Sequence, residues 1–273
     1  TAVTSGSGSV TFDKTAPTLS SVSIASDNSP TTLAKVSNVV TLTFTASETI
    51  STPVVTFLSG GAAITDTSVT YANTSGNTWT AAYTANASDT SGAVSFSIAF
   101  ADTAGNAGTA VTSGSGSVTF DTTAPTLSSV SIVSNNSINT LAMASDDITL
   151  TFTASETIST PVVTFQSGSA AITDTSVTYT NTGNTWTAAY TANASDTSGA
   201  VSYSIAFSDT AGNAGTAVTS GSGSVTFDTT APTLSSVSIA SNNSTTTLAK
   251  ADDVVTLTLT ASETIATPVV TFQ

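Results

Sequence analysis

The stretch TAVTSGSGSVTFD covers residues 109–121 and occurs unchanged at residues 1–13 and 216–228. The three copies begin at Thr1, Thr109 and Thr216, so the chain repeats about every 107 residues. The two intervals differ by one residue, because 73–77 read NTSGN where 181–184 read NTGN, a turn in which an insertion disturbs no packing. A period of this length matches a complete domain with its own core and is too long for a solenoid unit.

The repeats predict the domain organisation. Residues 1–13 are expected to be the last strand of a preceding repeat, and 229–273 the first three strands of a truncated repeat. Between them, 14–121 and 122–228 are two complete repeats. We therefore expect this chain to be a window from a longer polypeptide of tandem domains.

Within the second complete repeat, apolar residues alternate with threonine, as at Ile148, Leu150 and Phe152. Alternation with a period of two is typical of a strand with one buried face. Turn sequences rich in Asn, Asp and Gly separate such segments. We predict strands over 126–133, 147–155, 161–167, 175–180, 185–191, 200–208 and 216–227. The predicted fold class is all-β, with tandem immunoglobulin-like β-sandwich domains of about seven strands each and with Trp79 and Trp186 as core aromatics.

Composition excludes several classes of function. The chain has 17 acidic residues against three lysines, no histidine and a formal net charge of −14, which argues against a nucleic-acid partner. The absence of cysteine excludes disulfides and thiolate metal sites, and a unit of this size can bury a sufficient core without them. No apolar run reaches the roughly 18 residues that span a bilayer, so no direct membrane insertion is expected in this window.

The sequence also predicts that the protein is not an enzyme. Without His or Cys there is no imidazole base or thiolate nucleophile, which excludes the usual hydrolase triads. The recurring carboxylate pair, Glu156 and Asp209, is repeated in successive domains, which does not suit a glycosidase. The segment Gly114-Ser115-Gly116 leads into a strand, so it is expected to mark a bulged or closely packed strand and not a phosphate-binding loop.

Three motifs carry a family resemblance: FDTTAPT at 120–126, ASE at 154–156 and SDTAGN at 208–213. In this order they resemble the bacterial Ig-like tandem repeat domains of large secreted adhesins and biofilm-associated surface proteins, and the resemblance covers the whole chain. It implies an adhesion stalk at the bacterial cell surface, outside the cell, and rod-like domains with calcium at their junctions.

An immunoglobulin topology allows the calcium expectation to be placed on particular residues. We name the seven predicted strands A to G in chain order. The incoming linker, the B–C loop and the F–G loop meet at one pole of the sandwich, and oxygen ligands suit a hard cation such as Ca²⁺. The candidate ligands are Asp13, Glu48, Asp102 and Asn106 in the first complete repeat, Asp121, Glu156, Asp209 and Asn213 in the second, and Asp228 and Glu263 in the third. The alternative is that these side chains merely cap turns.

The leading hypothesis for function is a non-enzymatic structural extender of a bacterial adhesin, with neighbouring repeats of the same polypeptide as partners and with calcium setting the stiffness of the junctions. The alternative from the same fold is a subunit of a self-assembling extracellular filament or sheath, in which other copies are the partners. A third hypothesis is a module that binds a host glycan or protein, and the near-identical loops of successive copies argue against it.

Overall fold

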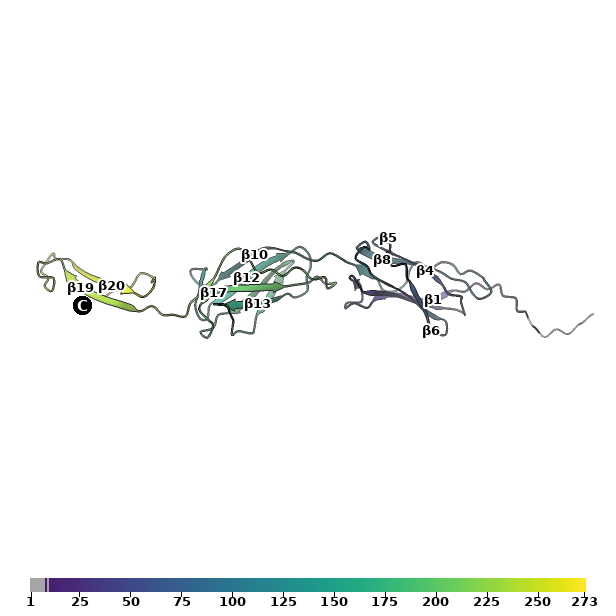
Figure 1. Cartoon of the computed structure of the whole chain (residues 1–273), viewed down its shortest axis with the longest axis horizontal. Helices are drawn as coiled ribbons and strands as arrows, with labels where there is room; N and C mark the ends of the chain where they lie inside the picture. Colours follow the sequence, from purple (N-terminus) through teal and green to yellow (C-terminus); the bar gives the residue numbers. More distant parts are fainter. Residues whose placement is uncertain (1–7, 9) are drawn as a thin grey trace, which may run out of the picture.

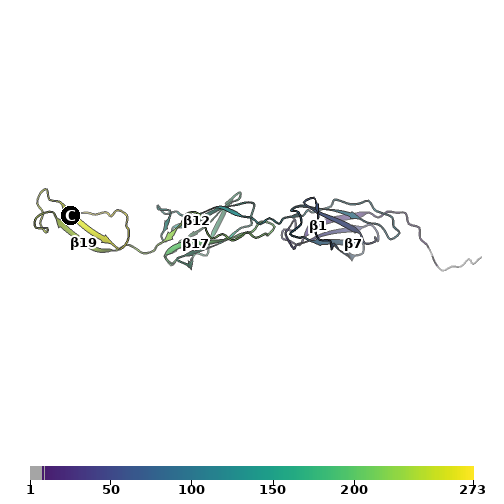
Figure 2. The ribbon, with the colours of Figure 1, turned by 45° about the horizontal axis from the view of Figure 1, so that its top comes forward.

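The computed structural model describes residue 8 and residues 10–273, and it contains two β-sandwiches followed by a two-stranded ribbon. These parts lie end to end in both views of the chain (Figure 1 and Figure 2). The first sandwich consists of β1 (Leu19–Ser26), β2 (Leu33–Ala34), β3 (Val39–Ala46), β4 (Val54–Ser59), β5 (Ala62–Ala63), β6 (Thr70–Ser75), β7 (Thr78–Thr84), β8 (Gly92–Ala99) and β9 (Thr119–Phe120). The second consists of β10 (Leu127–Ser134), β11 (Leu141–Ala142), β12 (Asp147–Ala154), β13 (Val162–Ser167), β14 (Ala170–Ala171), β15 (Thr178–Thr182), β16 (Thr185–Thr191), β17 (Gly199–Ala206) and β18 (Thr226–Phe227). The ribbon consists of β19 (Leu234–Ser241) and β20 (Val255–Ala261).

Both sandwiches have the same two sheets. The orders are β1-β3-β7-β6 and β2-β9-β8-β4-β5 in the first, and β10-β12-β16-β15 and β11-β18-β17-β13-β14 in the second. When the seven predicted strands are named A to G in chain order, these are A-B-E-D and G-F-C, with one short strand added at each end of the second sheet. This is the strand order of an immunoglobulin sandwich. The prediction of tandem Ig-like domains is therefore confirmed.

The alternating sequence places apolar side chains between the two sheets. In β12, Ile148, Leu150 and Phe152 are fully buried, whereas the threonines between them stay partly exposed. Trp186 is buried in the core of the second sandwich and Trp79 packs against the core of the first, as predicted. Each buried large apolar side chain stabilises the fold by roughly 1.5–3 kcal/mol, which allows a domain without disulfides to fold.

The last predicted strand, 216–227, is a regular strand over a short part of its length. Its ladder is confined to β18, and the preceding residues form isolated bridges. Val218 pairs with Ile205 of β17 in one sheet, and Ser222 pairs with Ser131 of β10 in the other. This segment therefore contacts both sheets: it pairs with β17 at Val218 and again in β18, bridges to β10 between them, and so closes that edge of the sandwich.

Glycine explains why the segment can lie so close to β10. A Cβ atom on Gly221 would lie 2.4 Å from the carbonyl oxygen of Val130, and one on Gly223 would lie 2.4 Å from that of Ile132. Gly223 also has a positive φ of 75°, which glycine adopts without strain. Gly114 and Gly116 make the same approach in the first sandwich. The interpretation of the Gly-Ser-Gly segment as closely packed is confirmed.

Predictions for the two ends of the chain have different outcomes. Of the strand predicted over 1–13, residues 1–7 and 9 lie outside the described residues, and 10–13 belong to no strand. The third strand predicted for the truncated repeat does not form over 268–273. Its equivalent β13 pairs with β17, and 268–273 have no such partner strand among the described residues.

Within the described part of the chain, no helix has the length and apolar character needed to cross a bilayer.

Candidate metal centre at the domain junction

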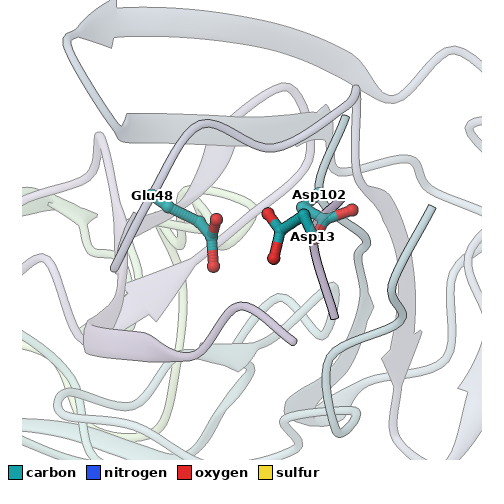
Figure 3. A group of neighbouring side chains, drawn as sticks. All are labelled: Asp13, Glu48 and Asp102. Atoms are coloured by element: carbon teal, nitrogen blue, oxygen red, sulfur yellow. The ribbon is translucent and has the colours of Figure 1, made fainter. Parts of the chain in front are cut away.

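Three carboxylates meet at the pole of each sandwich that receives the linker. In the second sandwich Glu156 follows β12, Asp209 follows β17, and Asp121 follows β9, the last strand of the preceding sandwich. One oxygen of each lies within 4.8 Å of the others. The same convergence in the first sandwich, shown in Figure 3, involves Asp13, Glu48 and Asp102. We call each of these sets an acidic trio.

The F–G loop member of each trio is buried and fixed by its own turn. Asp209 is 2% exposed. Its Oδ1 accepts hydrogen bonds from the N–H groups of Gly212 at 2.6 Å and Asn213 at 2.8 Å. In the first sandwich, hydrogen bonds from the Asn106 side chain and from the turn backbone outweigh burial and lower the pKa of Asp102. The hydrogen bonds of the turn thus favour the ionised form of Asp102.

Asn106 and Asn213, which the sequence placed among the ligands, lie beside the trios and face them with nitrogen. The Asn213 Nδ2 donates to Asp209 Oδ2 at 2.8 Å and to the carbonyl oxygen of Asp121 at 3.1 Å. Asn106 makes the corresponding bonds to Asp102 and Asp13, at 2.7 and 3.3 Å. In this structure each amide therefore positions the F–G carboxylate and the linker and does not add an oxygen to the trio.

The pKa of Glu156 reflects the crowding of negative charge in the trio. Burial raises its pKa, and the negative charges of Asp121 and Asp209 raise it further. A carboxylate beside two others resists ionisation because like charges repel. Binding of a cation would remove this repulsion.

Asp121 connects the two sandwiches. Its backbone N–H donates to the carbonyl oxygen of Ala34 in β2 at 2.8 Å, which ties it to the first sandwich. Its side chain belongs to the trio of the second sandwich. A cation held by this trio would therefore be coordinated from both domains.

The linker that follows Asp121 is anchored at both ends. The N–H of Thr122 donates to Ser91 Oγ of the first sandwich at 3.1 Å, and the N–H of Thr126 donates to Ser155 Oγ of the second at 3.0 Å. Pro125 is buried as well. Three residues, 123–125, are thus left between the two anchors, which restricts bending at the junction.

The third repeat has part of this arrangement. The N–H of Asp228 donates to Ala142 at 2.9 Å, as that of Asp121 does to Ala34. Glu263 occupies the position of Glu156, but the 273 residues end before the F–G loop that would supply the third carboxylate. Among the described residues, the complete trios are those of the first and second sandwiches.

The donor set fits a hard cation. It consists of carboxylate oxygens alone, the ligand type that Ca²⁺ prefers, and it lacks the nitrogen and sulfur ligands typical of zinc. Ca²⁺ takes six to eight oxygens at 2.3–2.6 Å, so backbone carbonyls and water would complete the shell. The residues present are thus compatible with calcium, and calcium binding stays a prediction.

Other acidic residues have a structural role that the sequence did not show. Asp196 lies in a turn sequence, Asp-Thr-Ser-Gly, yet it is only 6% exposed. Its carboxylate accepts hydrogen bonds from the N–H and hydroxyl of Thr173, each at 2.8 Å, and from the N–H of Asn193 at 2.9 Å. Burial raises the pKa of Asp196, but these hydrogen bonds lower it below the ordinary value. Asp89 fixes the same loop in the first sandwich.

Two hydrogen bonds between the sandwiches were not predicted. Lys35 Nζ donates to the carbonyl oxygen of Gly212 at 2.8 Å, and Asn28 Nδ2 donates to that of Ala211 at 2.9 Å. The sole sequence signal for the first was that Lys35 is one of three cationic side chains in the chain.

Comparisons with known proteins find similarity in structure and none in sequence families. No protein-family model matches the chain, and no curated protein sequence matches it. Among solved structures, an E-to-A variant of titin domains I67–I69 is 11% identical with a TM-score of 0.43, covering 92% of this chain and 78% of that one. The tandem Ig repeats of Dlar are 11% identical with a TM-score of 0.23, covering 79% and 99%. Both are tandem Ig-like structures, and the assignment of the fold rests on the strand pairing given above.

Proposed function

We propose that this chain is a structural extender, a stalk segment of a bacterial cell-surface adhesin outside the cell, in which calcium at the acidic trios stiffens the junctions. Each sandwich adds length, and no catalytic chemistry is needed for this role. The near-identical second copy of the first sandwich supports it, because repetition of a whole domain multiplies length. The resemblance of the junction motifs to adhesin repeats supports the surface location.

One observation carries the calcium part of the proposal: Asp121 is fixed to the first sandwich through its backbone and reaches the trio of the second with its side chain. A cation that is bound by residues of two domains favours the geometry in which both sets of ligands reach it. The bound cation therefore opposes bending. Ligand binding to the folded state alone stabilises it by RT ln(1 + [L]/Kd), which is about 2.7 kcal/mol when free calcium is 100 times Kd.

Small-angle X-ray scattering of the chain, with calcium and with excess chelator, tests the proposal. We expect a monomeric rod whose scattering profile shows greater bending at the junctions after chelation. An unchanged profile would remove calcium from the mechanism. A mass that grows with protein concentration would instead favour the alternative, a subunit of a self-assembling filament.

A further inference from the structure

The A–B loop of the first sandwich touches the F–G loop of the second. Lys35 lies between β2 and β3, and its ammonium group reaches the Gly212 carbonyl; Asn28, in the same loop region, reaches that of Ala211. Residues 35 and 212 are 177 positions apart, so the contact joins two separately folded domains. We call the Lys35–Gly212 and Asn28–Ala211 contacts the brace.

The F–G loops of the two sandwiches can be compared directly, and the comparison shows which residues the brace covers. Ala211 is 3% exposed, whereas its equivalent Ala104, in the first sandwich, is exposed. A Cβ atom on Gly212 would meet the Lys35 side chain at 3.1–3.7 Å, whereas one on the equivalent Gly105 would meet nothing within 4 Å. The preceding sandwich, and not the loop itself, therefore buries this part of the F–G loop.

The first and second sandwiches differ in sequence at two positions of the brace region. The position of Lys35 is occupied by Met143 in the second sandwich, and the methionine side chain has no N–H to donate. The position of Asn38 is occupied by Asp146, whose carboxylate binds the Asn136 side chain at 2.7 Å. Asn136 is the equivalent of Asn28, so in the second sandwich this amide is held within its own domain.

The third repeat has one of the two sequence differences without the other. It has Lys250 at the position of Lys35, but Asp253 at the position of Asn38. Asp253 binds the Asn243 side chain at 2.8 Å, as Asp146 binds Asn136. An acidic residue at this position therefore binds the amide within its own repeat in both repeats that have one.

We infer that the A–B loop of each repeat is a docking surface for the F–G loop of the next repeat, and that the residues at the positions of Lys35 and Asn38 decide whether the junction is braced. The partner is a second copy of the same domain in the same chain, recognised through the backbone carbonyls of its F–G turn. This inference does not rest on calcium, because carbonyl oxygens accept the lysine and asparagine protons in the absence of a cation. Junctions within one array then differ in stiffness.

The experiment measures the distance between spin labels on the two sandwiches in the full 273-residue chain. The chain has no cysteine, so Thr56→Cys and Thr164→Cys, both exposed and at equivalent positions in β4 and β13, would carry the labels. Double electron–electron resonance gives the distribution of distances in chelator and in calcium. The measurement in chelator isolates the brace, and the change on adding calcium reports separately on the proposed function.

Lys35→Met is the test variant, because methionine is the residue the second sandwich has at this position. The backbone N–H of Lys35, which donates to Asn38 Oδ1 at 2.8 Å, is retained. In chelator we expect a broader distance distribution with a shifted mean. Asn38→Asp should also broaden it by withdrawing Asn28, with no change in side-chain size.

Lys250→Met is the matched control, because this lysine has no following F–G loop within the 273 residues. We expect its distribution to match that of the parent. The inference is overturned if Lys35→Met leaves the distribution unchanged in chelator, or if Lys250→Met broadens it equally. Thermal unfolding of each variant establishes that both sandwiches remain folded.

Discussion

Replacing Glu156 with glutamine should have opposite effects in the absence and presence of calcium. In chelator, the substitution removes one of three neighbouring negative charges. Two unit charges 4 Å apart repel by about 1 kcal/mol in a water-like medium, and Glu156 has two such neighbours within 4.8 Å. Salt at 0.15 M reduces this repulsion, so we expect the second sandwich to gain about 1 kcal/mol, or about 4 °C in Tm.

In calcium, the same substitution should cost binding energy. Loss of one anionic ligand is expected to weaken binding about tenfold, which corresponds to about 1.4 kcal/mol. At a calcium concentration 100 times the parent Kd, the stabilisation by calcium would fall from about 2.7 to about 1.4 kcal/mol. The increment in Tm on adding calcium should therefore be roughly halved for the second sandwich.

Differential scanning calorimetry in chelator and in calcium measures both effects, and isothermal titration calorimetry adds the number of sites. The two complete trios predict two calcium ions per parent chain and one for Glu156→Gln at concentrations that fill the intact site alone. Glu263→Gln is the control, because the third repeat has no complete trio and the number should stay at two. A Glu156→Gln variant that is less stable than the parent in chelator, and that gains as much from calcium, would refute the electrostatic account of the site.

Three further predictions concern single sandwiches. Asp196→Ala leaves two N–H groups and a hydroxyl without their acceptor, so it should destabilise the second sandwich by roughly 2–4 kcal/mol. Asp174→Ala loses two exposed hydrogen bonds and should lower the free energy of unfolding by less. Urea unfolding of the two variants compares these effects. Gly221→Ala forces a methyl group against the Val130 carbonyl and should destabilise by about 1–3 kcal/mol, and an unchanged urea midpoint would contradict the close approach. The pKa of Glu156 is raised in the metal-free fold, so protonation of Glu156 favours the folded state. This contribution to stability is complete below the unfolded pKa of about 4.3 and is lost as pH rises through the folded pKa. The advantage of Glu156→Gln in chelator should therefore be present at pH 7 and vanish below pH 4 in a calorimetric pH series.

Most of the fold was predictable because alternation is a local property of the sequence. The strand predicted over 147–155 is observed as β12 at 147–154, and the first six predicted strands are all found within three residues of their predicted ends. The short strands β11 and β14 were missed, because two residues cannot show a period. The final strand was predicted too long, because Val218 and Val225 continue the apolar pattern on both sides of a glycine-containing stretch that forms only an isolated bridge to β10.

The acidic trio was predictable for a different reason. Asp121, Glu156 and Asp209 lie far apart in the chain, and the immunoglobulin topology alone brings their loops to one pole. The side-chain environment was not available from this argument: topology does not say that Asn213 presents nitrogen, or that Asp196 is buried. Such details depend on rotamers and hydrogen-bond partners that are set by the packed structure.

The contrast between the cores and the loops shows where variation between repeats can act. Phe44 and Phe152 occupy the same fully buried position, because a change of volume there disrupts packing within the domain. The A–B loop is under no such restriction from its own core, so Lys35 can be Met143 one repeat later without altering the sandwich. What the loop residue changes is its contact with the next domain. Repeats with nearly the same cores can therefore form joints of different stiffness, and the acidic trio, present at the linker pole of both sandwiches, would supply a cation-dependent contribution common to them.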